Sequence, residues 1–367
     1  MTGKFLKIAG LLMFLSTMVT EAQILKDTAT LNLIRRDIDL IYNLQFPEAR
    51  MIYDKVVEAY PGHPVAYLLN GMITYWENYP LIRTSPARAS FESDMRECIS
   101  LSEKSDDQEH EAEYLLANLS GRGFLLLFYS DNGMSGEVIP LASGTYKFLR
   151  RSFNYTSECT DLYYFTGVYN YYRDAYPRIY PVYKPLAMLF PSGNEKVGLE
   201  QLNIAAVNSV VLRAESLFLL VYIYTNFEND YHKSMAYAKT LYDLYPNNSE
   251  FTASYIKNLL LLKKYDEATK IINTMKEGSA GKFLQAQISV FRGIIQEKRY
   301  RNATLAVSYY NKGILDISLF GSYGNEYAAY AYFGLSRISE ANGDRRAAQM
   351  YHKEAVRIAD FKKVNFD

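Results

Sequence analysis

The sequence has little cysteine, histidine and tryptophan, and no excess of charge of either sign. Its 367 residues include two Cys, four His and one Trp, and Lys+Arg and Asp+Glu both number 40. Cys and His this sparse and scattered give no metal-ligand spacing, so we expect no metal site. A net charge of zero gives no general attraction to nucleic acid, so we expect no nucleic-acid partner.

Sequence motifs for catalysis are also missing. The chain contains no Gly-Lys phosphate loop and no Gly-x-Gly-x-x-Gly after a predicted strand. Acidic pairs such as Asp106-Asp107 fit solvated helix starts. Because catalysis needs several groups within hydrogen-bond reach of one another, we predict that the protein is not an enzyme, with no catalytic residues and no cofactor.

Apolar runs of the length needed to cross a bilayer, about 20 residues, do not occur. The nearest, residues 212–224, contains Arg213 and Glu215. We therefore expect no transmembrane segment.

The N-terminus has the pattern of a cleavable secretory signal. Lys4 and Lys7 precede a short apolar run over residues 8–19, and Thr20-Glu-Ala22 supplies acceptable cleavage-site residues. We expect residues 1–22 to be a signal peptide and the protein to be periplasmic or secreted. No Cys lies near the cleavage site, so we do not expect a lipoprotein. The alternative is an uncleaved amphipathic or buried N-terminal helix.

Export would permit a disulfide between Cys98 and Cys159. The two fall in different predicted repeats, and a bridge needs Cα atoms within about 7 Å. The sequence therefore favours two separate buried thiols over a bridge.

What the sequence does have is a repeated pattern of an aromatic residue, two polar residues and a small residue. It occurs as Tyr231-His-Lys-Ser234, Tyr265-Asp-Glu-Ala268 and Tyr300-Arg-Asn-Ala303, with aromatics 34 and 35 positions apart, and a related Phe46-Pro-Glu-Ala49 occurs near the N-terminus. A period near 34 residues is typical of helix-turn-helix repeats that stack into a solenoid. The sequence resembles the tetratricopeptide repeat family, of a secreted bacterial type. The resemblance implies an all-α fold, an α-solenoid of antiparallel helix pairs wound as a right-handed superhelix.

The repeats predict three regions in the mature chain. Residues 23–160 and 210–367 carry the helical repeats, and residues 161–209 form a Tyr- and Pro-rich segment. Four prolines at 177, 181, 185 and 191 predict short helices joined by turns there, in place of one continuous helix. This part loosely resembles the tetratricopeptide repeat 39-like proteins of inclusion-body clearance, through Phe165-Thr-Gly167, Gly193 to Leu199, and Arg213.

We predict that the protein is an interaction scaffold that holds a protein or peptide partner in the concave groove of the solenoid. Tyr and Arg are enriched at the energetic centres of interfaces, and the sequence offers a cluster of both. The predicted contact residues are Tyr169, Tyr172, Arg173, Tyr176, Arg178, Tyr180 and Tyr183. Two alternatives stay open: these residues pack the seam around the prolines, or they form aromatic platforms for an envelope carbohydrate or another small ligand. The partner's identity and the oligomeric state are left undetermined.

Overall fold

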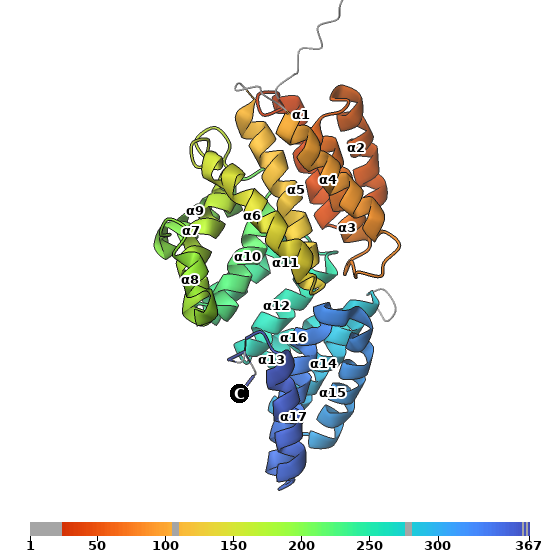
Figure 1. The fold of residues 1–367 in the computed structure, drawn as a ribbon. Coiled ribbons are helices and arrows are strands. Elements are labelled where there is room, and N and C mark those ends of the chain that lie inside the picture. Colours follow the sequence, from red (N-terminus) through yellow and green to blue (C-terminus); the bar gives the residue numbers. More distant parts are fainter. Residues whose placement is uncertain (1–23, 105–109, 276–280, 362, 365) are drawn as a thin grey trace, which may run out of the picture.

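The computed structural model describes residues 24–361 apart from 105–109 and 276–280, together with residues 363, 364, 366 and 367 (Figure 1). The predicted signal peptide, residues 1–22, lies outside the described residues. The same holds for the first residues of the helix start expected near Ser105, which are among 105–109.

The described chain is a succession of antiparallel helix pairs, which confirms the prediction of an all-α solenoid (Figure 1). The pairs are α1 (Thr28–Tyr42) with α2 (Phe46–Ala59), α3 (Pro64–Glu77) with α4 (Arg88–Lys104), α5 (Glu111–Asp131) with α6 (Ser135–Ser152), α7 (Leu162–Ile179) with α9 (Glu195–Asn208), α10 (Arg213–Asn226) with α11 (Tyr231–Leu244), α12 (Ser249–Leu261) with α13 (Tyr265–Thr274), α14 (Lys282–Lys298) with α15 (Ala303–Ile317), and α16 (Asn325–Ala341) with α17 (Arg345–Ile358). Short helices η1 (Pro181–Tyr183), α8 (Lys184–Ala187) and η2 (Ser318–Gly324) lie in the connections. Among the described residues there is no strand, and none of the helices combines the length and apolar character needed to cross a membrane.

The aromatic-x-x-small pattern marks the start of the second helix in three of the eight pairs. Helices α2, α11 and α13 begin at Phe46, Tyr231 and Tyr265, and the small residues Ala49, Ser234 and Ala268 are each fully buried at 0% exposure. A small side chain there lets the second helix approach the first closely, because any larger group would hold the helices apart.

The third match, Tyr300 to Ala303, lies differently at its helix. Helix α15 begins at Ala303, so its small buried residue is Ala306, while Tyr300 is 54% exposed and precedes the helix. The physical reason is the cap: the side chain of Asn302 accepts a hydrogen bond from the Leu305 amide and places the helix start at the small residue of the pattern, whereas α2, α11 and α13 begin at the aromatic residue.

The prolines interrupt less of the middle segment than expected. Helix α7 runs unbroken for 18 residues with Pro177 inside it, and the irregular part is confined to residues 180–194. Pro177 is tolerated because it lies in the last turn, where its missing N–H deprives only one carbonyl near the helix end. Pro140 is likewise accommodated inside α6, in the second turn after its start at Ser135.

The first helix pairs lie against the later repeats. Asn248 caps α12 by accepting from the Glu250 and Phe251 amides, and its own amide donates to the Tyr42 carbonyl at the end of α1 at 2.8 Å. The ring of Trp76 lies 5.4 Å from that of Tyr42 and 5.7 Å from that of Phe251, so the one Trp is a wedge between helices. The solenoid therefore curls back until α1 and α3 contact the start of α12.

Both cysteines are free and buried, as the sequence favoured. Burial raises the pKa of the Cys98 and Cys159 thiols well above the ordinary value, which keeps them in the unreactive protonated form.

Candidate binding site

Three of the predicted contact residues hold the connection after α7 in place. The Tyr169 hydroxyl donates to the Pro191 carbonyl at 2.6 Å, and the Arg173 guanidinium donates to the Phe190 carbonyl at 3.0 Å. Arg178 pairs with the Glu195 carboxylate of α9 at 2.8 Å. These bonds tie residues 190–195 to α7, so the three side chains have a structural use here.

The other four, Tyr172, Tyr176, Tyr180 and Tyr183, form one aromatic cluster. Tyr176 is at its centre, with ring centroids 6.5 Å from Tyr172, 4.8 Å from Tyr180 and 5.3 Å from Tyr183. Tyr172 is half-buried, and burial raises the pKa of its hydroxyl, while Tyr176 and Tyr183 are 38% and 43% exposed. The cluster thus has its open end at Tyr183.

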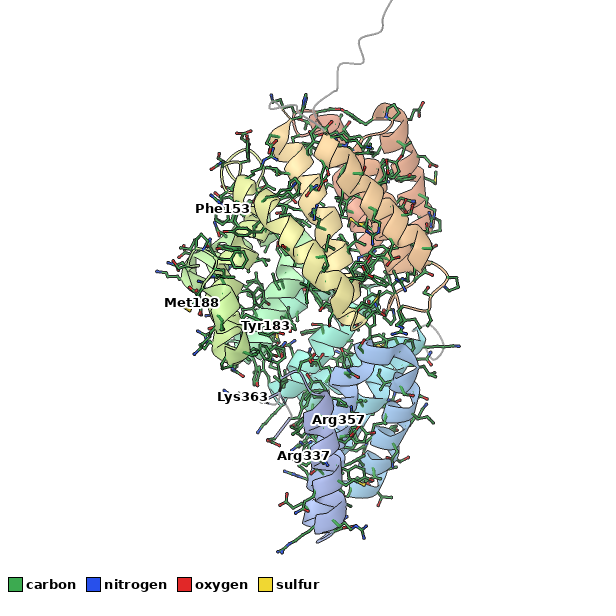
Figure 2. The ribbon with its side chains drawn as sticks, viewed as in Figure 1. Phe153, Tyr183, Met188, Arg337, Arg357 and Lys363 are labelled. Atoms are coloured by element: carbon green, nitrogen blue, oxygen red, sulfur yellow. The ribbon has the colours of Figure 1, made fainter. Side chains whose placement is uncertain are left out.

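Exposed apolar side chains continue this open end. Val182, Met188 and Leu189 are 79%, 81% and 76% exposed, and Figure 2 shows Tyr183 and Met188 on the same side of the molecule.

The C-terminal segment, residues 359–367, contacts the aromatic cluster at Tyr180. The Phe361 ring lies 6.3 Å from Tyr180, 5.7 Å from Tyr222 of α10 and 5.4 Å from Phe227, and the Tyr180 hydroxyl donates to the Asp360 carbonyl at 3.1 Å. The aromatic residues of α7 and α10 therefore receive an aromatic side chain that lies far from them in the sequence.

The same segment continues onto α16. Val364 and Phe366 are 1% and 8% exposed, and the Phe366 ring lies 4.9 Å from that of Tyr330. Asp367 pairs with Arg337 at 3.3 Å. Three apolar side chains and one carboxylate thus hold an irregular strip of chain on helices α10 and α16. Sequence reasoning missed this contact, although apolar residues beyond the last predicted helix were a signal that the end of the chain is anchored.

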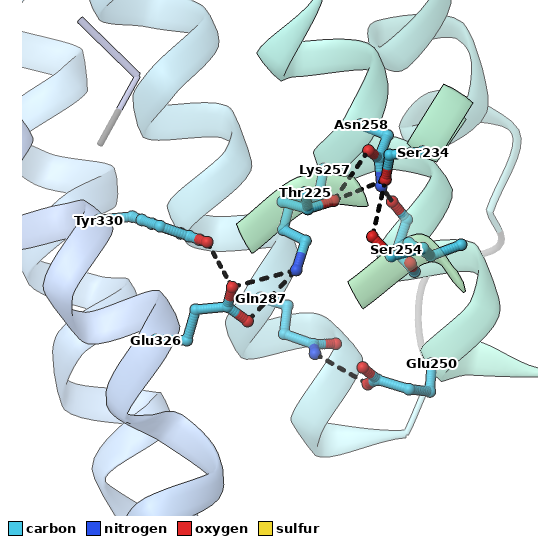
Figure 3. A network of polar contacts seen from close by, with 10 residues as sticks. Thr225, Ser234, Glu250, Ser254, Lys257, Asn258, Gln287, Glu326 and Tyr330 are labelled. Atoms are coloured by element: carbon cyan, nitrogen blue, oxygen red, sulfur yellow. Dashed lines mark hydrogen bonds and ion pairs between the residues drawn. The ribbon is translucent and has the colours of Figure 1, made fainter. Parts of the chain in front are cut away.

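Polar side chains lie between the first helices of the late repeats (Figure 3). The Lys257 ammonium of α12 lies 3.1 Å from the Glu326 carboxylate of α16, which also accepts from the Tyr330 hydroxyl. Gln287 of α14 donates to Glu250 of α12 at 3.2 Å. Burial raises the pKa of Glu250 to about 7, so this buried acid is held close to its neutral form.

A second network in Figure 3 joins α10, α11 and α12 and is structural. The Thr225 and Ser234 hydroxyls are 2.6 Å apart, and Asn258 receives a longer bond from Thr225 at 3.4 Å. All three side chains are buried, so these bonds satisfy polar groups between packed helices and present nothing to a ligand.

No group of three or more His, Cys, Asp or Glu side chains suited to a metal ion occurs among the described residues. The sequence matches no protein-family model and no curated protein. The case for a function therefore rests on the segment 359–367 and the helices that hold it.

Proposed function

We propose that this protein is an exported binding scaffold of the tetratricopeptide type, and that α7, α10 and α16 hold a segment of a partner protein. The observation that supports this is the position of residues 359–367, whose Phe361 and Phe366 rings pack on aromatic side chains of these helices. A surface that accepts one such strip from its own chain has the shape and chemistry for a similar strip from another chain.

The partner segment would resemble residues 359–367 in chemistry. It would carry two aromatic or large apolar side chains about five positions apart and an acidic residue after the second, to meet Tyr222, Tyr330 and Arg337. Because the chain's own segment is tethered, its effective concentration is in the mM range, and a partner must bind tightly or be abundant to displace it.

The test uses a fluorescently labelled peptide of residues 359–367 and a full-length variant carrying Phe361→Ala and Phe366→Ala. Loss of both anchors frees the site, so the variant should bind the peptide saturably in fluorescence anisotropy. The wild-type chain should bind it at least about tenfold more weakly, because its site is occupied. A peptide with both phenylalanines replaced by Ala is the matched control.

If the variant keeps its helical circular dichroism and shows no saturable binding of the wild-type peptide, the proposed function is wrong. If the variant loses helicity, a second chain with a protease site inserted after Ile358 replaces it. After cleavage, the C-terminal segment should exchange with the labelled peptide.

One pair of exposed aromatic rings supports the alternative of carbohydrate binding. Tyr176 and Tyr183 present two half-exposed rings 5.3 Å apart, and exposed aromatic rings can stack on the apolar face of a sugar. A glycan array compared between the wild type and Tyr183→Ser tests it: a signal that disappears in the variant supports sugar binding, and silence in both removes this alternative.

A further inference from the structure

Helices α10 and α16 and residues 359–361 line a cavity of about 80 Å³ that opens to solvent, and Tyr222 in its wall is 41% exposed. One water needs roughly 10–15 Å³ by the same measure, so the space admits a group several times larger. The cavity exists with the C-terminal segment in place. Because Ala359, Asp360 and Phe361 line it, the cavity is complete only while that segment stays bound.

The walls of this cavity are aromatic on three sides. Tyr222 comes from α10, Tyr330 from α16 and Phe361 from the C-terminal segment, and the Tyr222 and Phe361 rings meet edge to face at 5.7 Å. An aromatic ring is electron-rich on its face, so several rings around one space attract a cation.

The polar side chains of the cavity are Asn226, Glu326 and Asp360, together with the hydroxyl-bearing Tyr222 and Tyr330, and neither Lys nor Arg lines the space. Asn226 is 6% exposed, and its Oδ1 atom is buried without a hydrogen-bond partner among the described residues. A buried acceptor left unpaired is costly, and a rotation of the Asn226 side chain toward a donor in the cavity would remove that cost.

The charges around the cavity are also unbalanced. Glu326 is paired with Lys257 at 3.1 Å, but no side-chain partner within the described chain is found for the Asp360 carboxylate. Burial, and then the charge of Glu326, raise the pKa of Asp360. An entering cation would stabilise the ionised form of Asp360.

We propose that this cavity binds an alkylammonium group. Three aromatic rings, the Asn226 amide and the Asp360 carboxylate match the needs of an ammonium ion that carries carbon substituents, and the carboxylate would repel an anion. A bare divalent metal fits less well, because it prefers a shell of six or more oxygens to aromatic faces. The ammonium group belongs either to a free small amine or to a lysine side chain of another protein, and both sources share this chemistry.

The experiment is isothermal titration of the full-length chain with four probes: methylammonium, choline, Nα-acetyl-lysine amide, and 3,3-dimethylbutan-1-ol. The last copies the shape of choline without its charge. We expect saturable binding of at least one cationic probe and at least about tenfold weaker binding of the neutral one. Tighter binding of choline or methylammonium identifies a free amine as the source, and tighter binding of the lysine derivative identifies a side chain.

Asp360→Asn keeps the shape of the cavity and removes its unpaired charge, and we expect it to weaken the cationic probe by about tenfold or more. Asp243→Asn is the matched control, because Asp243 is exposed and pairs with Lys239 on the surface of α11. Tyr222→Leu, which removes one aromatic wall, should also weaken the cation more than the neutral probe. Equal affinity for choline and its neutral analogue, or unchanged affinity in Asp360→Asn, overturns the proposal, as does the absence of saturable binding by every cationic probe. The titration uses the chain with its own C-terminal segment bound, whereas the peptide experiment removes the two phenylalanine anchors of that segment. Either experiment can therefore fail while the other succeeds.

Discussion

The α14–α16 repeats and the α7–α9 pair both depend on glycine, but the glycines face different neighbours. In the repeats, a Cβ atom on Gly293 or Gly334 would lie 2.5 Å or 2.3 Å from the ring of Tyr310. In the α7–α9 pair, a Cβ atom on Gly198 would lie 2.6 Å from the backbone nitrogen of Tyr171 and 2.9 Å from the carbonyl oxygen of Gly167.

The two regions differ in whether the neighbour of the glycine can make room for a larger residue. The repeats use glycine to seat a side chain between two first helices, and a side chain can be shortened by mutation. The α7–α9 pair uses glycine to bring two helix backbones into contact, and a backbone cannot be shortened. The Pro-rich connection therefore joins two helices whose backbones touch at Gly167 and Gly198, whereas the α14–α16 repeats place the Tyr310 ring between their first helices.

The largest effect follows from this contact. Gly198→Ala should lower the free energy of unfolding by about 3 kcal/mol or more, because α9 must move away from α7. The higher helix propensity of Ala returns only about 1 kcal/mol. Urea denaturation followed by circular dichroism measures the change.

The matched control for this variant is Gly123→Ala in the middle of α5, where the new Cβ would make an ordinary contact of 3.8 Å with Phe165. Gly123→Ala should be neutral or slightly stabilising. If both substitutions have the same effect, the α7–α9 contact is not as close as the structure shows.

The sequence predicts a structural feature well when the residues that determine it are close together in the chain. The starts of α11 and α13 followed from the residues at Tyr231 and Tyr265, because a helix start depends on its own few residues. The different start of α15 at Ala303 is also local, since it follows from the capping side chain of Asn302.

The C-terminal segment shows the limit of such prediction. Phe361 meets Tyr222 across about 140 positions of sequence, and no period in the chain encodes that contact. The cavity was likewise beyond reach, because its walls come from two helices and from a segment outside the repeats. The predicted Tyr and Arg residues lie on α7 and the connection after it, and which of them contact a partner stays a prediction.

The second-largest effect concerns the buried ion pair of the α14–α16 repeats. Glu297 of α14 accepts two bonds from the Arg337 guanidinium of α16, at 2.7 Å and 2.9 Å, and one from the Tyr310 hydroxyl at 2.6 Å. Glu297→Gln leaves Arg337 without this carboxylate in a largely buried place. We expect a loss of about 2 kcal/mol at pH 7, measured by urea denaturation.

The pH dependence of that loss has a definite sign. Burial raises the pKa of Glu297, but the bonds and charge of Arg337 outweigh burial and leave the pKa below its ordinary value of 4.5. The stability that Glu297 contributes is therefore present above about pH 4.5 and disappears as the pH falls through the lower folded-state pKa. The wild type and Glu297→Gln should converge in stability at acidic pH. A constant difference from pH 7 down to acid would show that the pair contributes by packing alone.

A smaller effect tests the spacer role of Tyr310. Gly334→Ala should cost about 1–2 kcal/mol, because the ring is fully buried and must shift. In a Tyr310→Leu background the same substitution should become neutral or stabilising, since the ring is gone and helix propensity favours Ala. A double-mutant cycle by urea denaturation measures this coupling. Additive effects would contradict the contact between Gly334 and Tyr310.

The smallest effect belongs to the ion pair of the α7–α9 region. Arg178 and Glu195 are 2.8 Å apart, but their side chains are 53% and 30% exposed, so water and salt screen their attraction. Glu195→Gln should cost less than about 1 kcal/mol, and 0.5 M salt should remove most of the difference. A loss as large as that of Glu297→Gln would mean that the Pro-rich connection is held mainly by this pair, and the glycine contact would then not explain how the α7–α9 pair stays closed. We expect Gly198→Ala to destabilise the protein far more than Glu195→Gln. That order would mean that backbone contact, and not the exposed ion pair, holds helices α7 and α9 together.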